Sequence, residues 1–187
     1  MDKIKVHSLL LKCTANINFT TADTAGLIGI YYSEGKAIAS NSHVLFIVQY
    51  DYDPSYEGCV IDRKGNEVCK PYPNYKRVIP PAEATRECTD PTILNNLYRA
   101  ARNLRHSEIG YHQACLRIEN MCFHPLYILD VLQMFKLLKE PFKLFLSPGL
   151  PAVFNSPSCT ALVMPLANCE EFNKVTVADA ANFGDLL

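Results

Sequence analysis

Apolar residues in the first 70 positions recur in short runs that are typical of β-strands. Four runs predict β structure: residues 3–13, 26–32, 36–53 and 59–69. The polar turn at 33–36 predicts a hairpin, and the run after it predicts one long strand or two strands broken at Asn41-Ser42. A second hairpin is predicted within 59–69, with its turn at 64–66. We therefore expect this part of the chain to form a set of strands.

The pattern changes to a helical period after residue 90. Asp90 suits the N-cap of a helix and Pro91 suits its first position. On a helical wheel one side of this segment is apolar: Ile93, Leu94, Leu97, Ala101 and Leu104. The opposite side is polar and cationic: Asn95, Arg99, Arg102 and His106. A second helix is predicted over 125–139, and its apolar residues on more than one side indicate burial against a sheet and a neighbouring element or subunit.

Further strands are predicted around and after the second helix. Residues 112–123 predict one strand between the helices, and three short strands follow at 142–147, 151–156 and 159–166. Residues 168–187 are polar apart from a small apolar end at 182–187. This order is typical of an α+β fold with antiparallel sheets packed against two helices. We expect one domain over 1–167 and a carboxyl-terminal tail over 168–187.

The composition is that of an ordinary globular protein. Of the 187 residues, 49% are hydrophobic and 20% are charged, so the chain can bury a sizeable core. Its net charge is −1, and any contact with DNA must therefore come from a local basic patch. No run approaches the ~18 apolar residues of a membrane span, and the first residues lack the pattern of a secretory signal. We expect a cytoplasmic protein.

The eight cysteines include no C-x-x-C pair. A long, core-rich chain favours reduced buried thiols, although a disulfide between Cys59 and Cys69, at the two ends of the predicted hairpin, stays open. His112, Cys115, Cys122 and His124 are residue types that bind zinc. In a single strand, however, Cys115 and Cys122 point to opposite faces. We expect neither a metal nor another cofactor.

Sequence motifs of catalytic sites are absent. The chain has no nucleophile elbow, no zinc-protease helix, no dinucleotide-binding loop and no phosphate-binding loop. Cys59 and His43 could pair as nucleophile and base, but neither lies in a local signature of such a site. An enzyme that uses Cys or His stays open as an alternative, and we expect a non-catalytic protein.

Four short blocks, in order, resemble the bacterial DNA polymerase III β subunit, the sliding clamp. Residues 39–46 (ASNSHVLF) resemble its A-T-D-G-H-R-L-A block, and residues 72–80 (YPNYKRVIP) resemble its F-P-D-Y-R-R-V-I-P block. Residues 123–135 (FHPLYILDVLQMF) resemble its F-N-x-x-Y-L-L-D-x-L helix, and residues 159–167 (CTALVMPLA) resemble its Y-V-V-M-P-M-R strand. The resemblance implies a shortened, divergent clamp-like fold.

The departures from the family limit what the resemblance implies. The chain is much shorter than a clamp subunit, and the spacing from His43 to Tyr75 leaves no room for much of the middle clamp domain. We therefore expect the counterpart of the last clamp domain plus part of the middle one. Four residues differ within the blocks, with Asn, Ser, Val and Ala where the family has Asp, Gly, Arg and Arg: Asn41, Ser42, Val44 and Ala167.

In the sliding clamp, parts of three blocks form a groove that captures short peptides of polymerases, loaders and repair proteins. The resemblance places these residues in such a groove: Ser40, Ser42, His43, Leu45, Pro73, Arg77, Val78, Leu162, Met164, Pro165 and Leu166. Pro73 and Pro165 would form rigid walls, and Met164 would adapt to different side chains. The cationic Arg77 would anchor the peptide at the rim. The alternative is that these residues close the edge of a sheet.

The family also uses cations on its helices to contact the phosphates of double-stranded DNA without reading its sequence. The resemblance implies this role for Arg99, Arg102, Arg105 and His106. Because a ring around DNA needs several such domains, a homo-oligomer is expected. The alternative is a clamp-fold interaction module that does not bind DNA. In that case residues 182–187 could occupy the groove of their own or a neighbouring chain.

Overall fold

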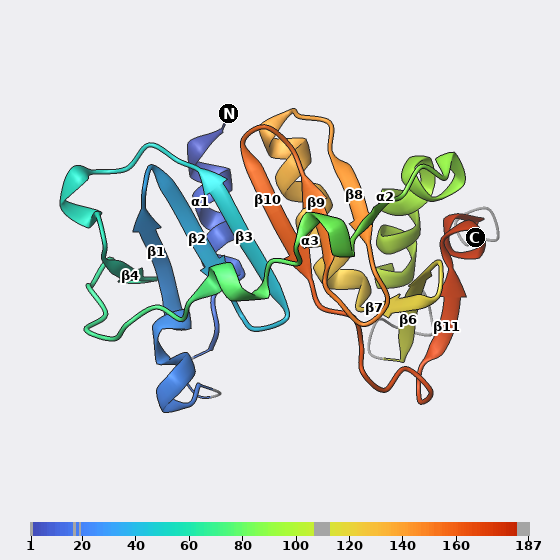
Figure 1. Cartoon of the computed structure of the whole chain (residues 1–187), viewed down its shortest axis with the longest axis horizontal. Coiled ribbons are helices and arrows are strands. Elements are labelled where there is room, and N and C mark those ends of the chain that lie inside the picture. Colours follow the sequence, from blue (N-terminus) through green and yellow to red (C-terminus); the bar gives the residue numbers. More distant parts are fainter. Residues whose placement is uncertain (1, 17, 19, 107–112, 183–187) are drawn as a thin grey trace.

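The computed structural model describes residues 2–16, 18, 20–106 and 113–182. Its larger sheet has eight strands, all paired antiparallel, in the order β4-β1-β2-β3-β10-β9-β8-β5 (Figure 1). The bounds of these strands are β1 (Gly29–Ser33), β2 (Lys36–Ser40), β3 (Val44–Gln49), β4 (Val60–Asp62), β5 (Arg86–Glu87), β8 (Lys143–Leu146), β9 (Ala152–Asn155) and β10 (Cys159–Val163). Strands from both halves of the chain meet where β3 pairs with β10, so one continuous sheet joins the two halves.

A smaller sheet and four α-helices complete the described fold. The small sheet has the order β11-β6-β7, with β6 (Ala114–Ile118) antiparallel to β7 (Met121–Phe123) and parallel to β11 (Asn173–Thr176). The helices are α1 (Lys3–Lys12), α2 (Pro91–His106), α3 (Pro125–Leu138) and α4 (Val177–Asn182). The predicted α+β class with antiparallel sheets packed against helices is confirmed. Within the described residues, none of the helices is apolar over a length that could cross a membrane.

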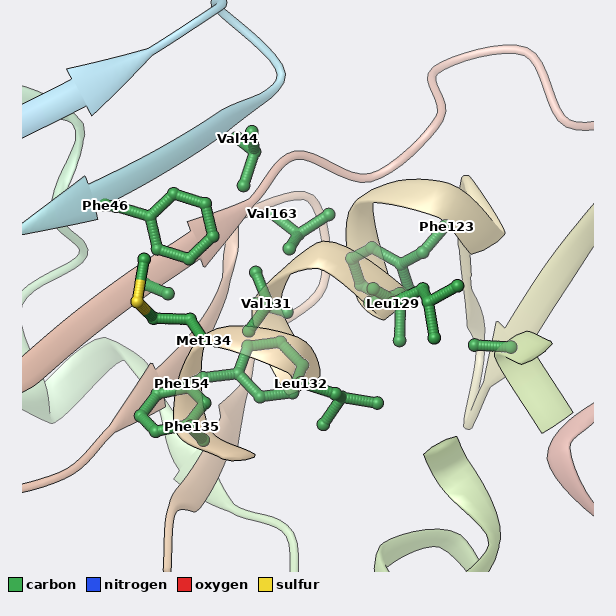
Figure 2. Packing of buried hydrophobic residues seen from close by; sticks show 14 of the residues in the cluster. Val44, Phe46, Phe123, Leu129, Val131, Leu132, Met134, Phe135, Phe154 and Val163 are labelled. Atoms are coloured by element: carbon green, nitrogen blue, oxygen red, sulfur yellow. The ribbon is translucent and has the colours of Figure 1, made fainter. Parts of the chain in front are cut away.

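The main core lies between the eight-stranded sheet and helices α1 and α3. Along β3 the residues alternate, so that Val44, Phe46 and Val48 belong to the core on the helical side. Figure 2 shows Val131 and Met134 of α3 beside the side chains of this face of the sheet. Residues between these positions in β3 face the other side of the sheet, where a second, smaller apolar cluster forms. The sheet therefore has two buried faces with different coverings.

The strand predicted over 3–13 is wrong, because Lys3–Lys12 is the helix α1. Val6, Leu9, Leu10 and Cys13 are buried, and this spacing of three to four residues follows the helical period. Asp2 caps the helix by accepting a hydrogen bond from the Lys5 N–H at 3.2 Å. The alternation of Lys and apolar residues at the start of the segment suggested a strand, but it does not continue through the three consecutive leucines.

The two helices predicted in the second half of the chain are confirmed. The Asp90 carboxylate accepts a hydrogen bond from the Thr92 N–H at 2.8 Å, and α2 begins at Pro91 as predicted. Helix α3 ends at Leu138, and the residue that follows, Lys139, caps it in a left-handed conformation with φ of 59°. The hairpin at 33–36 is also confirmed, and the run 36–53 forms two strands that are broken at Asn41-Ser42.

Two other segments differ from the sequence predictions. Residues 112–123, predicted as one strand, contain the β6–β7 hairpin, which turns at Glu119 with φ of 52°. The hairpin pairs Arg117 with Cys122 and so places Cys122 on the same face as Cys115, not on the opposite face. Among the described residues, no group of His, Cys, Asp or Glu could hold a metal ion, and His112 lies outside them.

The segment 168–187 was predicted to be a polar tail, yet its residues 173–182 form a strand and a helix that pack on the rest of the fold. Strand β11 pairs with β6, and Val177, Ala180 and Ala181 of α4 are buried. The Asn103 side-chain amide of α2 donates hydrogen bonds to the Ala180 and Ala181 carbonyls at 3.0 and 3.1 Å. The division into 1–167 and 168–187 stays a proposal. The predicted docking segment 182–187 lies outside the described residues except for Asn182.

Candidate functional site

A hollow of about 270 Å³ opens on the face of the eight-stranded sheet that is opposite to α1 and α3. Its lining comes from five separate segments: Thr24, Leu27, Ser40, Ser42, His43, Val44, Leu45, Tyr72, Pro73, Asn74, Tyr75, Val78, Pro151, Leu162 and Met164. We call this hollow the groove. Of the four blocks that suggested a family, three contribute to its lining, so segments distant in sequence share one site.

The segment 72–79 forms one wall because it packs across the outer face of the sheet. Tyr72, Tyr75 and Ile79 cover a cluster of sheet residues: Ile38, Leu45 and Leu162. The Tyr72 ring stacks on Tyr31 with 5.2 Å between centroids and an interplanar angle of 13°. Tyr75–Val78 within this segment is a 3-10 helix. The turn leaves Val78 48% exposed at the groove instead of paired in a sheet.

Gly26 allows the wall to approach the segment that carries Thr24 and Leu27. A Cβ atom at Gly26 would lie 2.4 Å from the Pro71 carbonyl oxygen, a distance that no side chain tolerates. The backbone next to Tyr72 therefore lies directly against the 3-10 helix Ala22–Ile28. This contact brings Leu27 into the same hollow as Pro73.

The loop 40–44 forms the second wall and is fixed by its own polar groups. The Ser40 hydroxyl donates to the Val44 carbonyl at 2.8 Å, and the Asn41 side-chain oxygen accepts from the N–H groups of His43 and Val44 at 3.0 Å each. Ser42 adopts a φ of 75°, which the bonds around it support. Because these bonds are local, the loop is preorganised without a ligand.

The end of β10 forms the third wall and is joined to the loop. The Met164 N–H donates to the His43 carbonyl at 2.9 Å, and Met164 is 40% exposed. The His43 ring stacks on Tyr127 of α3, with 5.4 Å between centroids. The Leu166 N–H donates to the Cys122 carbonyl of β7 at 2.9 Å. The three walls are thus held to one another and to the helical layer.

The structure places eight of the eleven predicted groove residues in the lining: Ser40, Ser42, His43, Leu45, Pro73, Val78, Leu162 and Met164. Arg77, Pro165 and Leu166 are not among the lining residues. Arg77 is exposed on the 3-10 turn, beside Val78. Sequence reasoning missed three lining residues that carry no motif: Thr24, Leu27 and Pro151. It also omitted four that belong to recognised blocks: Val44, Tyr72, Asn74 and Tyr75. The role of each residue stays a proposal.

The lining is mainly apolar and holds no carboxylate, lysine or arginine. The Tyr72 hydroxyl is the only buried side-chain polar atom of the described residues that has no hydrogen-bond partner. Burial raises the pKa of Tyr72 well above its ordinary value and also raises the pKa of Tyr75, so both phenols stay neutral. A neutral apolar hollow with preorganised walls suits the binding of apolar side chains.

The predicted cations of α2 form a separate surface. Arg99, Arg102, Arg105 and His106 are all exposed. None of them belongs to an ion pair within the described part of the chain, and Arg99 donates a hydrogen bond to the Asn96 side chain at 2.9 Å. The apolar side of α2, with Leu97, is buried.

The disulfide between Cys59 and Cys69 that the sequence left open is absent from the structure, where both residues are free thiols.

Comparison with solved structures identifies the fold, whereas no family model and no curated protein matches the sequence. A DNA polymerase sliding clamp of Caulobacter crescentus superposes with a TM-score of 0.61 at 15% identity, over 89% of this chain and 64% of that one. The β subunit of Thermotoga maritima DNA polymerase III gives 0.60 at 14%, over 90% and 65%. A Helicobacter pylori β clamp bound to a DNA ligase peptide gives 0.59 at 10%, over 88% and 63%. The chain thus spans less than two thirds of each of these clamps.

Proposed function

We propose, from the sliding-clamp fold that this chain has, that it is a non-catalytic interaction module that captures a short peptide of a partner protein in the groove. One observation carries the proposal: the His43 loop, the Tyr72–Val78 segment and the end of β10 converge on a single apolar hollow. The peptide bound to the Helicobacter pylori clamp comes from a DNA ligase. Partners among replication or repair proteins in the cytoplasm are therefore part of the proposal.

Binding in this groove follows from apolar burial. The exposed side chains Val78 and Met164 gain contacts when a ligand side chain enters between them. Each well-buried apolar anchor of a peptide contributes about 1.5–3 kcal/mol, and a few such anchors carry most of the affinity of a peptide site. Arg77 stands outside the lining, and we assign to it a charged contact at the rim. Pro165 and Leu166 would support Met164 from behind.

The test is a fluorescence anisotropy titration of the full chain with the DNA ligase peptide that the Helicobacter pylori clamp binds. Met164→Asp places a charge in the apolar lining and should weaken binding by about tenfold or more. Ile4→Asp is the matched control, because Ile4 is 80% exposed and lies on α1, away from the groove. Equal affinities of the two variants, or no binding by the wild-type chain, would disprove the proposal.

The exposed cations of α2 support a second proposed role, weak binding to double-stranded DNA that is independent of sequence. One chain offers too few cations to hold a duplex strongly, so this role includes a homo-oligomer. Arg99→Glu combined with Arg102→Glu should abolish binding to a duplex of about 20 base pairs at low salt without unfolding the protein. Light scattering measures the assembly. A chain that is a monomer and does not bind DNA at low salt would disprove this second role. The peptide-binding module would then be the remaining proposal.

A further inference from the structure

A cleft of about 670 Å³ is lined by residues of α2, α3 and the loop before β8: Leu94, Tyr98, Leu132, Phe135, Lys136, Lys139, Glu140, Pro141 and Phe142. Helices α2 and α3 pack against each other, and Figure 1 shows where they lie. The Phe135 and Phe142 rings lie 5.2 Å apart between centroids. The Tyr98 side chain, on α2, is 39% exposed. This cleft shares no residue with the groove.

The cations of the cleft lack carboxylate partners in the part of the chain that the structure describes. Lys136 and Lys139 are exposed, and neither belongs to an ion pair there. The Lys136 ammonium lies 5.4 Å from the centroid of the Tyr98 ring, which holds it over the cleft. Arg102 follows Tyr98 by one helical turn and is also exposed.

The carboxylate of Glu140 is already engaged on the far side of the loop. It accepts hydrogen bonds from the Ser156 hydroxyl at 2.6 Å, the Ser158 hydroxyl at 2.8 Å and the Ser158 N–H at 3.2 Å. These neutral donors turn the Glu140 carboxylate toward the β9–β10 turn but leave it charged. Lys136 and Lys139 outnumber it in the lining, so the rim of the cleft carries a net positive charge. Its floor stays aromatic and aliphatic.

We infer that this cleft binds an acidic amphipathic segment of a partner protein, with apolar side chains on the aromatic floor and carboxylates at Lys136 and Lys139. A segment with apolar residues at i, i+3 and i+4 and carboxylates beside them matches both parts of the lining. Duplex DNA would satisfy the cations but has no apolar groups to fill the space around Tyr98 and Phe142. The mainly apolar lining therefore favours a protein segment over a nucleic acid.

The test uses a labelled peptide of about 15 residues built from Glu and Leu, with leucines along one helical face. Anisotropy titration of the full chain should show binding. Lys136→Glu and Tyr98→Ser, taken separately, should each weaken it by about tenfold. Lys64→Glu is the matched charge control, because Lys64 is exposed on a distant turn, and it should leave affinity unchanged. Circular dichroism melts establish that each variant is folded.

Three results would overturn the inference. One is a peptide of the same composition in scrambled order that binds as tightly, because the cleft requires an apolar face. Another is Met164→Asp abolishing the binding, which would place the peptide in the groove. The third is a wild-type chain that does not bind the peptide but binds duplex DNA in a manner sensitive to Lys136→Glu, which would assign the cations to phosphates. Since the groove is tested with a different peptide, its failure and the failure of the cleft are separate outcomes.

Discussion

Tyr72 shows how much of the groove depends on single residues. Its ring stacks on Tyr31 and covers the outer apolar cluster, while its hydroxyl is buried without a hydrogen-bond partner. The family block that this segment resembles has Phe at this position. An aromatic ring without a hydroxyl is therefore enough for the packing, and the Tyr72 hydroxyl is not needed for it. A buried donor that has lost its water without gaining a partner costs about 1–3 kcal/mol.

We therefore predict that Tyr72→Phe raises the free energy of unfolding by about 1 kcal/mol, because it removes the unsatisfied hydroxyl and keeps the ring. Urea denaturation of the two proteins measures the change. Tyr52→Phe is the contrasting control, since the Tyr52 hydroxyl donates to Glu57 and accepts from the Gly35 N–H at 3.2 Å. This second variant should be less stable than the wild type. A destabilised Tyr72→Phe protein would show that the hydroxyl has a partner after all.

At the scale of the elements, the clearest sequence signals were caps and turns. Asp90-Pro91 and Pro125 marked the beginnings of α2 and α3, and both helices were predicted correctly. Helix α1 had a single capping residue, Asp2, and mixed periodicity, so its period was misjudged. The β6–β7 turn was missed because Glu119 carries its positive φ without a glycine to signal it.

The residues of the groove also divide into those that the sequence signals and those that it does not. Those within the blocks, such as His43 and Met164, could be predicted because the blocks resemble a known family. Thr24, Leu27 and Pro151 could not, because they reach the hollow through tertiary packing alone. Gly26 explains part of that packing, but nothing in the local sequence indicates that the Pro71 carbonyl lies against it.

The Glu140 carboxylate, just after α3, is hydrogen-bonded to the turn between β9 and β10, and we call this contact the Glu140 clasp. It predicts that stability depends on pH. Hydrogen bonds from Ser156 and Ser158 hold the pKa of Glu140 below its ordinary value of 4.5. A carboxyl whose pKa is depressed by folding contributes stability above its unfolded pKa and loses it as the pH falls through the folded one. Stability should therefore fall below about pH 4.5. In Glu140→Gln this contribution should be absent at every pH.

Urea denaturation at pH 7 and at pH 3.5 would compare the wild type with Glu140→Gln. The variant should be the less stable protein at pH 7 and should lose less stability on acidification. Glu83→Gln provides the control, because Glu83 is exposed and makes none of the described side-chain hydrogen bonds or ion pairs. Its acid dependence should match that of the wild type. An identical profile for Glu140→Gln would mean that the clasp contributes no stability.

At the scale of the whole molecule, the sheet separates two surfaces. The groove opens on one face. Helices α1 and α3 cover the other face, and α2 packs beside α3 (Figure 1). The carboxyl-terminal part of the described chain belongs to the α2 side, where β11 extends the small sheet and α4 packs on α2. Residues 173–182 therefore complete the layer that carries the cations.

This arrangement predicts effects of very different size for two alanines of α4. Ala180 is buried against α2, whereas Ala178 is exposed. Ala180→Asp would bury an unpaired carboxylate and should lower the free energy of unfolding by about 3 kcal/mol or more, while Ala178→Asp should change it by less than about 0.5 kcal/mol. Urea denaturation measures both. If this region were a free tail, the two variants would be equally stable, so the difference between them reports directly on whether α4 is part of the core.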